Sequence, residues 1–137
     1  MATAPGYSGK PLAAKLGIVD GMEVAALHAP AEYAGWVAPL PPGARIVGKL
    51  AATTRFVHWF GTERAKLDAA LNDCRRRLPP DAVLWISWPK KSAKVDTDIT
   101  DNTIRELALP LGWVDVKVCA VSEVWSGLKL VVRKTLR

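Results

Sequence analysis

The chain has 137 residues, of which half are apolar, and its formal net charge at neutral pH is +6. This length fits one domain, and this composition argues against a disordered chain. No apolar run reaches the roughly 18 residues that a membrane-spanning helix needs. Residues 1–6 lack the basic and apolar regions of a secretory signal. We therefore expect a single cytoplasmic domain over residues 1–137 that makes no contact with a membrane.

The cysteines, Cys74 and Cys119, both lie within apolar patterns. We interpret them as reduced core residues of a cytosolic protein and not as a disulfide. The positive net charge permits an acidic partner without identifying one.

The first third of the chain predicts short elements separated by turns. Residues 1–9 are small and polar, and we expect them to be flexible. Residues 11–16 fit a short helix that ends at Gly17. The elements expected after it are an apolar strand over residues 22–27, a brief helix over residues 32–37 and a weaker strand over residues 45–50.

The middle of the chain predicts a β-α-β unit. Residues 55–60 are rich in β-branched and aromatic side chains, which favours a buried strand. Thr62 is expected to cap the next helix, and Pro79 and Pro80 end it. Apolar side chains recur on one face of that helix, at Leu67, Leu71, Cys74 and Leu78. Residues 82–87 are apolar on both faces, which is typical of a central parallel strand.

The last third predicts one helix and a pair of strands. Thr100 is a good N-cap, and Pro110 is expected to kink or end the helix. Residues 113–121 and 128–133 predict strands whose short connection favours an antiparallel pair. The element order therefore predicts an α/β fold with a mostly parallel sheet, an antiparallel C-terminal pair and helices on both faces.

Four segments of the chain stand out as motifs: Gly6-Tyr7-Ser8-Gly9-Lys10-Pro11, Trp88-Pro89-Lys90-Lys91, residues 116–121 and Trp125-Ser126-Gly127-Leu128-Lys129. Together they resemble a bacterial family that is defined by a domain of unknown function. This resemblance extends over nearly the whole chain and implies no activity.

Residues 22–135 also resemble a trimmed class I methyltransferase, the Rossmann-like kind that binds S-adenosylmethionine. The run from Arg55 to Trp88 is similar to the fourth strand, following helix and fifth strand of that family. The last two strands are similar to its closing antiparallel pair. The resemblance implies a Rossmann-like, methyltransferase-like mixed sheet.

The chain departs from that second family at two places that bind the cofactor. The family follows its first strand with a glycine-rich turn, whereas residues 28–31 contain no glycine. The family ends its second strand with a carboxylate for the ribose hydroxyls, whereas this strand ends in Gly48-Lys49-Leu50. A lysine side chain cannot accept those hydrogen bonds. We therefore predict no cofactor, with S-adenosylmethionine disfavoured.

Trp88-Pro89-Lys90-Lys91 is the leading candidate for a site. It follows a parallel strand, and open α/β sheets bind ligands at the carboxyl ends of their strands. Lys90 and Lys91 would supply positive charge, and Trp88 would supply a stacking face. The alternative is a solvated basic loop with Trp88 packed on the rim of the sheet. Asp96 and Asp98, which follow, are interpreted as turn and capping groups.

Four other positions have either a functional or a structural interpretation. His28 ends the first strand, where it can donate or accept a hydrogen bond to a ligand. His58 lies in the middle of a strand and is interpreted as a core histidine. Trp125 either walls a ligand site or packs at a hairpin. Ser8-Gly9-Lys10 lacks the preceding strand and the Ser/Thr of a phosphate loop, so it is either a mobile arm or a frayed terminus.

These observations predict a non-catalytic binding or regulatory module. Its ligand would be small and anionic or nucleotide-like, and its site would use His28, Gly61, Trp88, Lys90, Lys91 and Trp125. We expect residues 22–27 and 82–87 to run side by side in the same direction, so that their final residues open onto this site. The alternatives are a divergent methyltransferase and a weak nucleic-acid binder. We expect no nucleic-acid partner, because the basic residues show no regular aromatic interleaving and indicate a general basic surface. The histidines and cysteines lack metal-binding spacing, so no metal site is expected. A homodimer through residues 45–50 is possible because that strand would lie at an edge.

Overall fold

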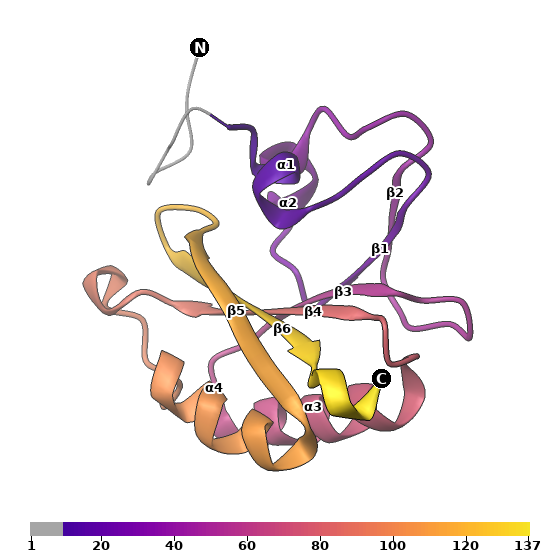
Figure 1. Cartoon of the computed structure of the whole chain (residues 1–137). Coiled ribbons are helices and arrows are strands. Elements are labelled where there is room, and N and C mark those ends of the chain that lie inside the picture. The colour runs from indigo at the N-terminus through magenta and orange to yellow at the C-terminus, as the bar shows by residue number, and fades with distance from the viewer. Residues whose placement is uncertain (1–9) are drawn as a thin grey trace.

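The protein is a six-stranded sheet between two layers of helices (Figure 1). The computed structural model describes residues 10–137, so the flexibility predicted for residues 1–9 and the residues Ser8 and Gly9 lie outside it. The strands are β1 (Glu23–Leu27), β2 (Arg45–Val47), β3 (Phe56–Phe60), β4 (Val83–Pro89), β5 (Trp113–Ala120) and β6 (Trp125–Val132). Their order across the sheet is β2-β1-β3-β4-β6-β5.

The strand directions confirm the predicted mixed sheet. Strands β2, β1, β3 and β4 run parallel to one another, whereas β6 is antiparallel to both β4 and β5. The prediction that residues 22–27 and 82–87 form adjacent strands is wrong. The site was expected where residues 22–27 and 82–87 lie side by side, but β3 lies between β1 and β4. Both strands still point to the same edge of the sheet, as their parallel pairing with β3 requires.

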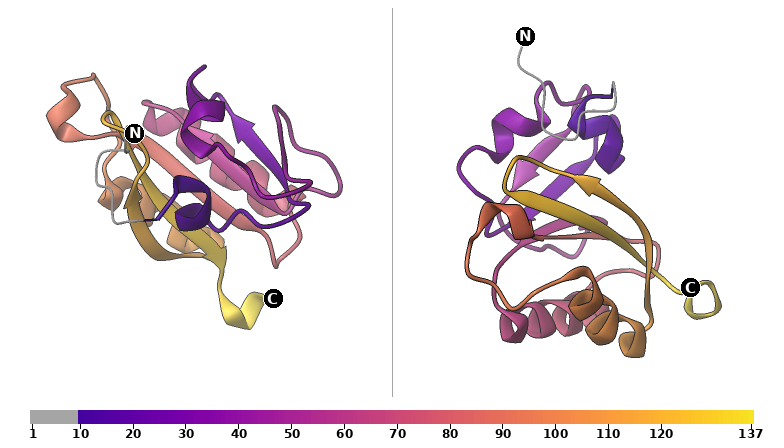
Figure 2. Two further views of the ribbon diagram at one scale, coloured as in Figure 1. Left: turned by 90° about the horizontal axis from the view of Figure 1, so that it is seen from above. Right: turned by 90° about the vertical axis from the view of Figure 1, so that its left-hand side faces the viewer.

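Helices cover both faces of the sheet (Figure 2). Helices α1 (Leu12–Leu16) and α2 (Tyr33–Val37) pack on what we call the upper face, and α3 (Arg64–Arg77) and α4 (Asp101–Ala108) pack on the lower face. Short 3-10 turns complete the chain at η1 (Lys91–Ala93), η2 (Leu109–Leu111) and η3 (Lys134–Leu136). Because β3 and β4 alternate side chains between the faces, each strand supplies both cores.

The two cores contain the apolar stripes that the sequence shows. Leu67, Leu71 and Cys74 of α3 are buried beneath the sheet with Ile104 and Ala108 of α4. The upper core contains side chains of α1 and α2 and the side chains of β3 and β4 that point to the upper face. They are Leu12, Leu16, Tyr33, Val37, Phe56, Phe60 and Trp85. Both cysteines are free, as predicted; Cys74 is buried and Cys119 is half-buried.

The helix starts show one correct and one wrong capping prediction. Thr100 caps α4 as predicted, in a reciprocal capping box with Thr103. Thr62 does not cap α3, because the N-cap residue is Glu63 and its side chain makes no capping hydrogen bond. The first backbone N–H of α3, that of Arg64, donates instead to Asp98 Oδ1 at 2.6 Å. A carboxylate 34 residues away in the sequence therefore satisfies the start of α3.

Asp98→Ala should lower the free energy of unfolding by about 1 kcal/mol, which is the usual cost of losing a capping side chain. Thr62→Ala is the matched control and should change it by less than about 0.5 kcal/mol, since no hydrogen bond of the Thr62 hydroxyl contributes to the cap. Urea titrations of the two variants measure the difference. Equal effects would show that Asp98 does not act as the cap.

Several boundaries differ from the predicted ones because strand pairing decides where a strand ends. Strand β2 stops at Val47, so the edge strand is shorter than predicted. Strand β6 begins at Trp125 instead of residue 128, and β4 continues to Pro89 because Trp88 and Pro89 pair with Ser126 and Trp125. Within the part of the chain described, none of the helices has the length and apolar character needed to cross a bilayer.

Candidate functional site at the carboxyl ends of β1 and β3

A cavity of about 820 Å³ opens at the carboxyl ends of β1 and β3 and continues along α3. Its size is typical of cavities that hold small organic ligands. Its lining comes from the ends of three strands and from one flank of α3: Leu27, His28, Trp59, Phe60, Gly61, Thr62, Glu63, Lys66, Ala69, Ala70, Asp73, Cys74, Arg76 and Trp125. The cavity therefore lies at the edge of the sheet where open α/β folds bind their ligands.

His28 stands at the mouth of the cavity with an unusual backbone. It directly follows β1, it is exposed, and its φ is 58°, in the left-handed region. This conformation is uncommon outside glycine, although histidine adopts it more readily than most residues. The left-handed turn lets the chain leave β1 sharply, and it places a ring with a donor and an acceptor nitrogen at the rim.

Aromatic rings form the inner wall. Phe60 and Trp125 meet edge to face with ring centroids 5.2 Å apart, and Trp59 is 3% exposed. The Trp59 indole lies directly over Gly61, where a Cβ would overlap the ring. Gly61 therefore leaves the space that Trp59 needs to form the wall.

Gly61→Ala should destabilise the fold by about 1–3 kcal/mol, because the Trp59 ring is enclosed and cannot move away freely. Gly48→Ala is the control: a Cβ there meets no atom within 4 Å, so its effect should stay near zero. Thermal unfolding followed by near-ultraviolet circular dichroism reports both stability and the environment of Trp59. A Gly61→Ala protein as stable as the wild type would contradict this packing.

The charged groups of the lining are paired with one another. Lys66 Nζ lies 3.0 Å from Glu63 Oε2, and Arg76 Nη2 lies 3.1 Å from Asp73 Oδ1. Two cations and two carboxylates therefore cancel. Cys74 adds no charge, because burial, with a further contribution from Asp73, raises the pKa of its thiol to about 12. The cavity is close to electrically neutral apart from His28.

The structure brings together three of the six predicted site residues. His28, Gly61 and Trp125 line the cavity, but Trp88, Lys90 and Lys91 do not. Trp88 is 9% exposed and packs in the lower core. Trp88 and Pro89 belong to β4, so the prediction that the whole motif follows the strand is wrong for these two residues.

The two lysines of that motif lie around η1. The Lys90 backbone N–H donates to the Val124 carbonyl at 2.7 Å, and Lys91 begins η1 and is exposed. The predicted site includes no residue of α3, although one flank of this helix lines the cavity. No pattern in the sequence indicates which polar face of a helix borders a cavity. Trp59 was placed correctly in a buried strand, but only its contact with Gly61 shows that it forms a wall.

The loop between η1 and α4 supports the rim of the cavity. The Thr97 hydroxyl and the Asp98 backbone N–H both donate to the Thr62 carbonyl, at 2.7 and 3.2 Å. Together with the Asp98 cap of α3, these bonds fix Thr62 beside Gly61. Asp98 is thus a capping group, as predicted, and the loop that contains it holds the rim of the cavity through hydrogen bonds.

A second polar cluster lies behind the aromatic wall. His58 is fully buried, with Nδ1 2.9 Å from the Tyr33 hydroxyl and Nε2 2.7 Å from Ser87 Oγ. Its ring stacks on Phe60 with centroids 4.4 Å apart. Burial lowers the pKa of His58 to about 3 and raises that of Tyr33. His58 is therefore a neutral core histidine, as the sequence indicates, and its two hydroxyl partners satisfy both ring nitrogens.

No cluster of three or more His, Cys, Asp or Glu side chains suited to a metal ion occurs among residues 10–137. Every buried side-chain nitrogen and oxygen atom in the same part of the chain has a hydrogen-bond partner. The lining of the cavity offers apolar contacts, aromatic rings and the hydrogen-bonding groups of His28 and Thr62.

Solved structures of methyltransferases share this fold. A S-adenosylmethionine-dependent methyltransferase from Aquifex aeolicus is 14% identical with a TM-score of 0.55, and the match covers 88% of this chain and 87% of that one. A type 11 methyltransferase candidate from Sulfolobus solfataricus is 7% identical with a TM-score of 0.59, covering 97% and 95%. Fibrillarin from Aeropyrum pernix, solved with bound S-adenosyl-L-methionine, is 11% identical with a TM-score of 0.58, covering 92% and 70%.

At these identities the likeness shows a shared fold, and it confirms the methyltransferase-like, Rossmann-like mixed sheet. Comparison with curated proteins finds no match. A family model described as "Protein of unknown function (DUF3052)" matches residues 51–134, from just before β3 into η3, which is more than half of the chain. The chain therefore belongs to the DUF3052 family of proteins of unknown function.

Proposed function

We propose that this protein is a non-catalytic module that binds a small organic ligand in the cavity at the carboxyl ends of β1 and β3. The single observation that carries the proposal is the position of that cavity, at the edge where this class of sheet binds ligands. The exposed ring of His28 at its mouth supplies a directional hydrogen bond.

The lining favours a ligand with a planar, largely uncharged body, such as a nucleoside. The half-buried Trp125 offers a ring contact, with the nearly buried rings of Trp59 and Phe60 behind it. The charges of Lys66, Glu63, Arg76 and Asp73 cancel in pairs. Lys90 and Lys91, which would have attracted a phosphate, lie outside the cavity. We therefore narrow the ligand class from anionic or nucleotide-like to nucleoside-like and net neutral.

The chain lacks the carboxylate after its second strand that would bind the ribose hydroxyls of S-adenosylmethionine. Strand β2 is followed by Gly48 and Lys49, and neither can accept hydrogen bonds from ribose hydroxyls with its side chain. Among the cavity side chains, Glu63 and Asp73 are held in ion pairs and the Cys74 thiol stays protonated. These features support binding without a reaction.

A thermal-shift series tests the proposal, using adenosine and S-adenosylhomocysteine against AMP and inorganic phosphate. A ligand at 100 times its Kd stabilises the fold by about 2.7 kcal/mol, so nucleosides should raise Tm measurably. Inorganic phosphate alone should leave it unchanged. Stabilisation by S-adenosylhomocysteine but not by adenosine would favour the alternative of a divergent methyltransferase, and stabilisation only by phosphate-bearing compounds would overturn the neutral-ligand assignment.

His28→Gly should separate binding from stability. Glycine accepts the left-handed backbone without strain, so the free energy of unfolding should stay unchanged or rise by up to about 1 kcal/mol. The loss of one hydrogen bond should weaken ligand binding by about 2- to 10-fold. His28→Asn, which tolerates the same backbone and keeps a polar group, should bind better than His28→Gly. Equal affinity for wild type and both variants, by calorimetry, would remove His28 from the site.

A further inference from the structure

The charges of the protein are unevenly paired between the two faces of the sheet. Among residues 10–137, ion pairs tie seven carboxylates to nearby cations: Glu23–Arg45, Asp81–Arg55, Glu106–Arg64, Glu63–Lys66, Asp73–Arg76, Asp73–Arg77, Asp101–Arg105 and Asp115–Arg105. The pairing register places no carboxylate on the upper side of β5 and β6. The positive excess of the chain is therefore concentrated in part on that side.

A β-bulge decides which residues of β5 reach the upper side. Asp115 pairs with Leu130 on the lower side, where it accepts a hydrogen bond from Arg105 of α4 at 3.1 Å. The register then shifts, with Val116 as the extra residue, so that Lys117 pairs with Lys129. Strict alternation would have put Asp115 and Lys117 on the same side, but the bulge turns them to opposite sides.

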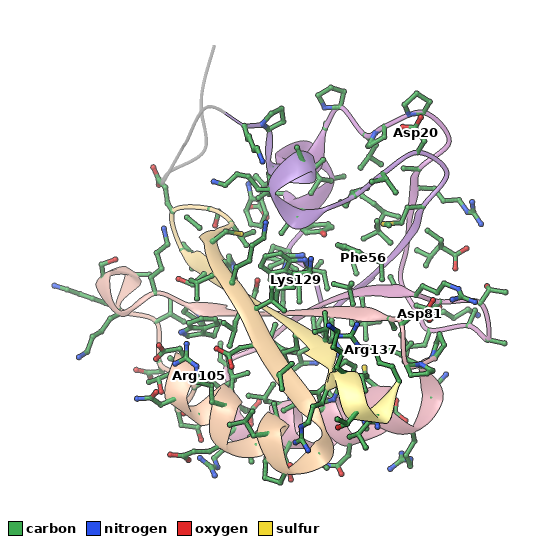
Figure 3. All side chains as sticks on the ribbon, in the orientation of Figure 1. Asp20, Phe56, Asp81, Arg105, Lys129 and Arg137 are labelled. Carbon is green, nitrogen blue, oxygen red and sulfur yellow. The ribbon has the colours of Figure 1, made fainter. Side chains whose placement is uncertain are left out.

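Lys117 and Lys129 consequently stand directly opposite each other on the upper side. Lys129 also pairs with Trp85 of β4, which lies in the upper core, and Figure 3 shows Lys129 on the same side of the sheet as Phe56, with Arg105 on the other side. Like charges at directly opposite positions of neighbouring strands destabilise a sheet. Within residues 10–137 neither ammonium group forms an ion pair with a carboxylate, so no ion pair in that part of the chain offsets their repulsion.

A third cation joins this pair from another element. Lys15 of α1 and Lys117 both act electrostatically on the thiol of Cys119, whose pKa burial nevertheless raises. Cys119 lies on the upper side with Gly127, next to the Lys117–Lys129 pair along β5. We name Lys15, Lys117 and Lys129 the lysine face. Lys117 is exposed, and Lys15 and Lys129 are half-buried. None of the three lines the cavity, so the lysine face is a separate surface.

We propose that the lysine face binds the phosphodiester backbone of a nucleic acid. An open surface in water holds one small anion weakly, because solvent and salt screen exposed charges. A polyanion gains by contrast from several contacts at once and from the release of its condensed counterions. A backbone phosphate between Lys117 and Lys129 would also remove their repulsion, and the net charge of +6 would add attraction at longer range.

The test measures binding of a fluorescently labelled, mixed-sequence DNA duplex to the full chain as a function of salt. Binding should weaken steeply as salt rises. Lys117→Gln with Lys129→Gln should reduce the slope of log K against log salt by about 1.8, since each lost phosphate contact removes about 0.9. The control Lys49→Gln with Arg55→Gln removes the same charge beside β2 and β3, away from β5 and β6 in the strand order, and should change the slope much less.

Lys129→Glu distinguishes a binding surface from a structural one. It converts the repulsive pair into an attractive Lys117–Glu pair, so the melting temperature should hold or rise. DNA affinity should nevertheless fall at least as far as in the double glutamine variant. The proposal is overturned if the duplex does not bind at low salt, if both double variants lose affinity equally, or if polyglutamate displaces DNA as well as unlabelled duplex does, which would assign the face to an acidic protein.

Discussion

Equilibrium unfolding of this protein should show a loss of stability of about 1.4 kcal/mol for each pH unit below about 6.5, through the burial of a single histidine. The responsible group is His58, which lies fully buried between Tyr33 and Ser87. Between pH 6.5 and pH 5 the expected loss is about 2 kcal/mol, a substantial part of the stability of a small domain.

The sign follows from the two pKa values. Burial holds the pKa of His58 at about 3 in the folded protein, whereas a histidine in an unfolded chain titrates near 6.5. Between those values the unfolded chain binds a proton that the folded protein does not. The stabilisation is therefore fully present above pH 6.5 and is lost as the pH falls towards 3.

His58→Gln should remove this dependence, since an amide can replace both hydrogen bonds without titrating. The variant is expected to lose stability at neutral pH but to show a flat profile from pH 6.5 to pH 5. His28→Gln is the matched control, because His28 is the other histidine of the chain and has no part in the buried network. A His58→Gln profile as steep as that of the wild type would show that other groups cause the acid sensitivity.

Trp85→Phe should destabilise the protein by about 1–3 kcal/mol, mostly through one lost hydrogen bond. The Trp85 indole N–H donates to the Leu16 carbonyl at 2.9 Å in a buried position. Leu16 is the last residue of α1, so no later turn of that helix can bond its carbonyl. The substitution would leave this acceptor unsatisfied and would loosen the contact of α1 with the sheet.

Trp113→Phe is the matched comparison, since both indoles are fully buried. The Trp113 N–H donates to the Leu71 carbonyl at 3.3 Å, but Leu71 lies inside α3, where its carbonyl also accepts from the helix backbone. Trp113→Phe should therefore cost less than Trp85→Phe in the same urea titration. The opposite ranking would mean that ring volume, and not the unsatisfied carbonyl, sets the cost.

Most of the helices and strands, and the class of fold, follow from local patterns in the chain. The stripe Leu67, Leu71 and Cys74 identifies α3 because a helix repeats every 3.6 residues, and these side chains are buried as expected. Thr100 and Pro110 mark the start and the end of α4 because capping and the missing proline N–H act within one turn. The order of strands and helices then led to the correct mixed sheet.

Contacts between residues far apart in the chain depend on how the whole chain packs. Asp98 caps α3, β3 separates β1 from β4, and the bulge at Val116 turns Lys117 away from Asp115. The same holds for the cavity, where His28 and Trp125 come from opposite ends of the chain. Local propensities act over a few residues, whereas these features depend on packing and pairing between segments far apart in the chain, which no local pattern encodes.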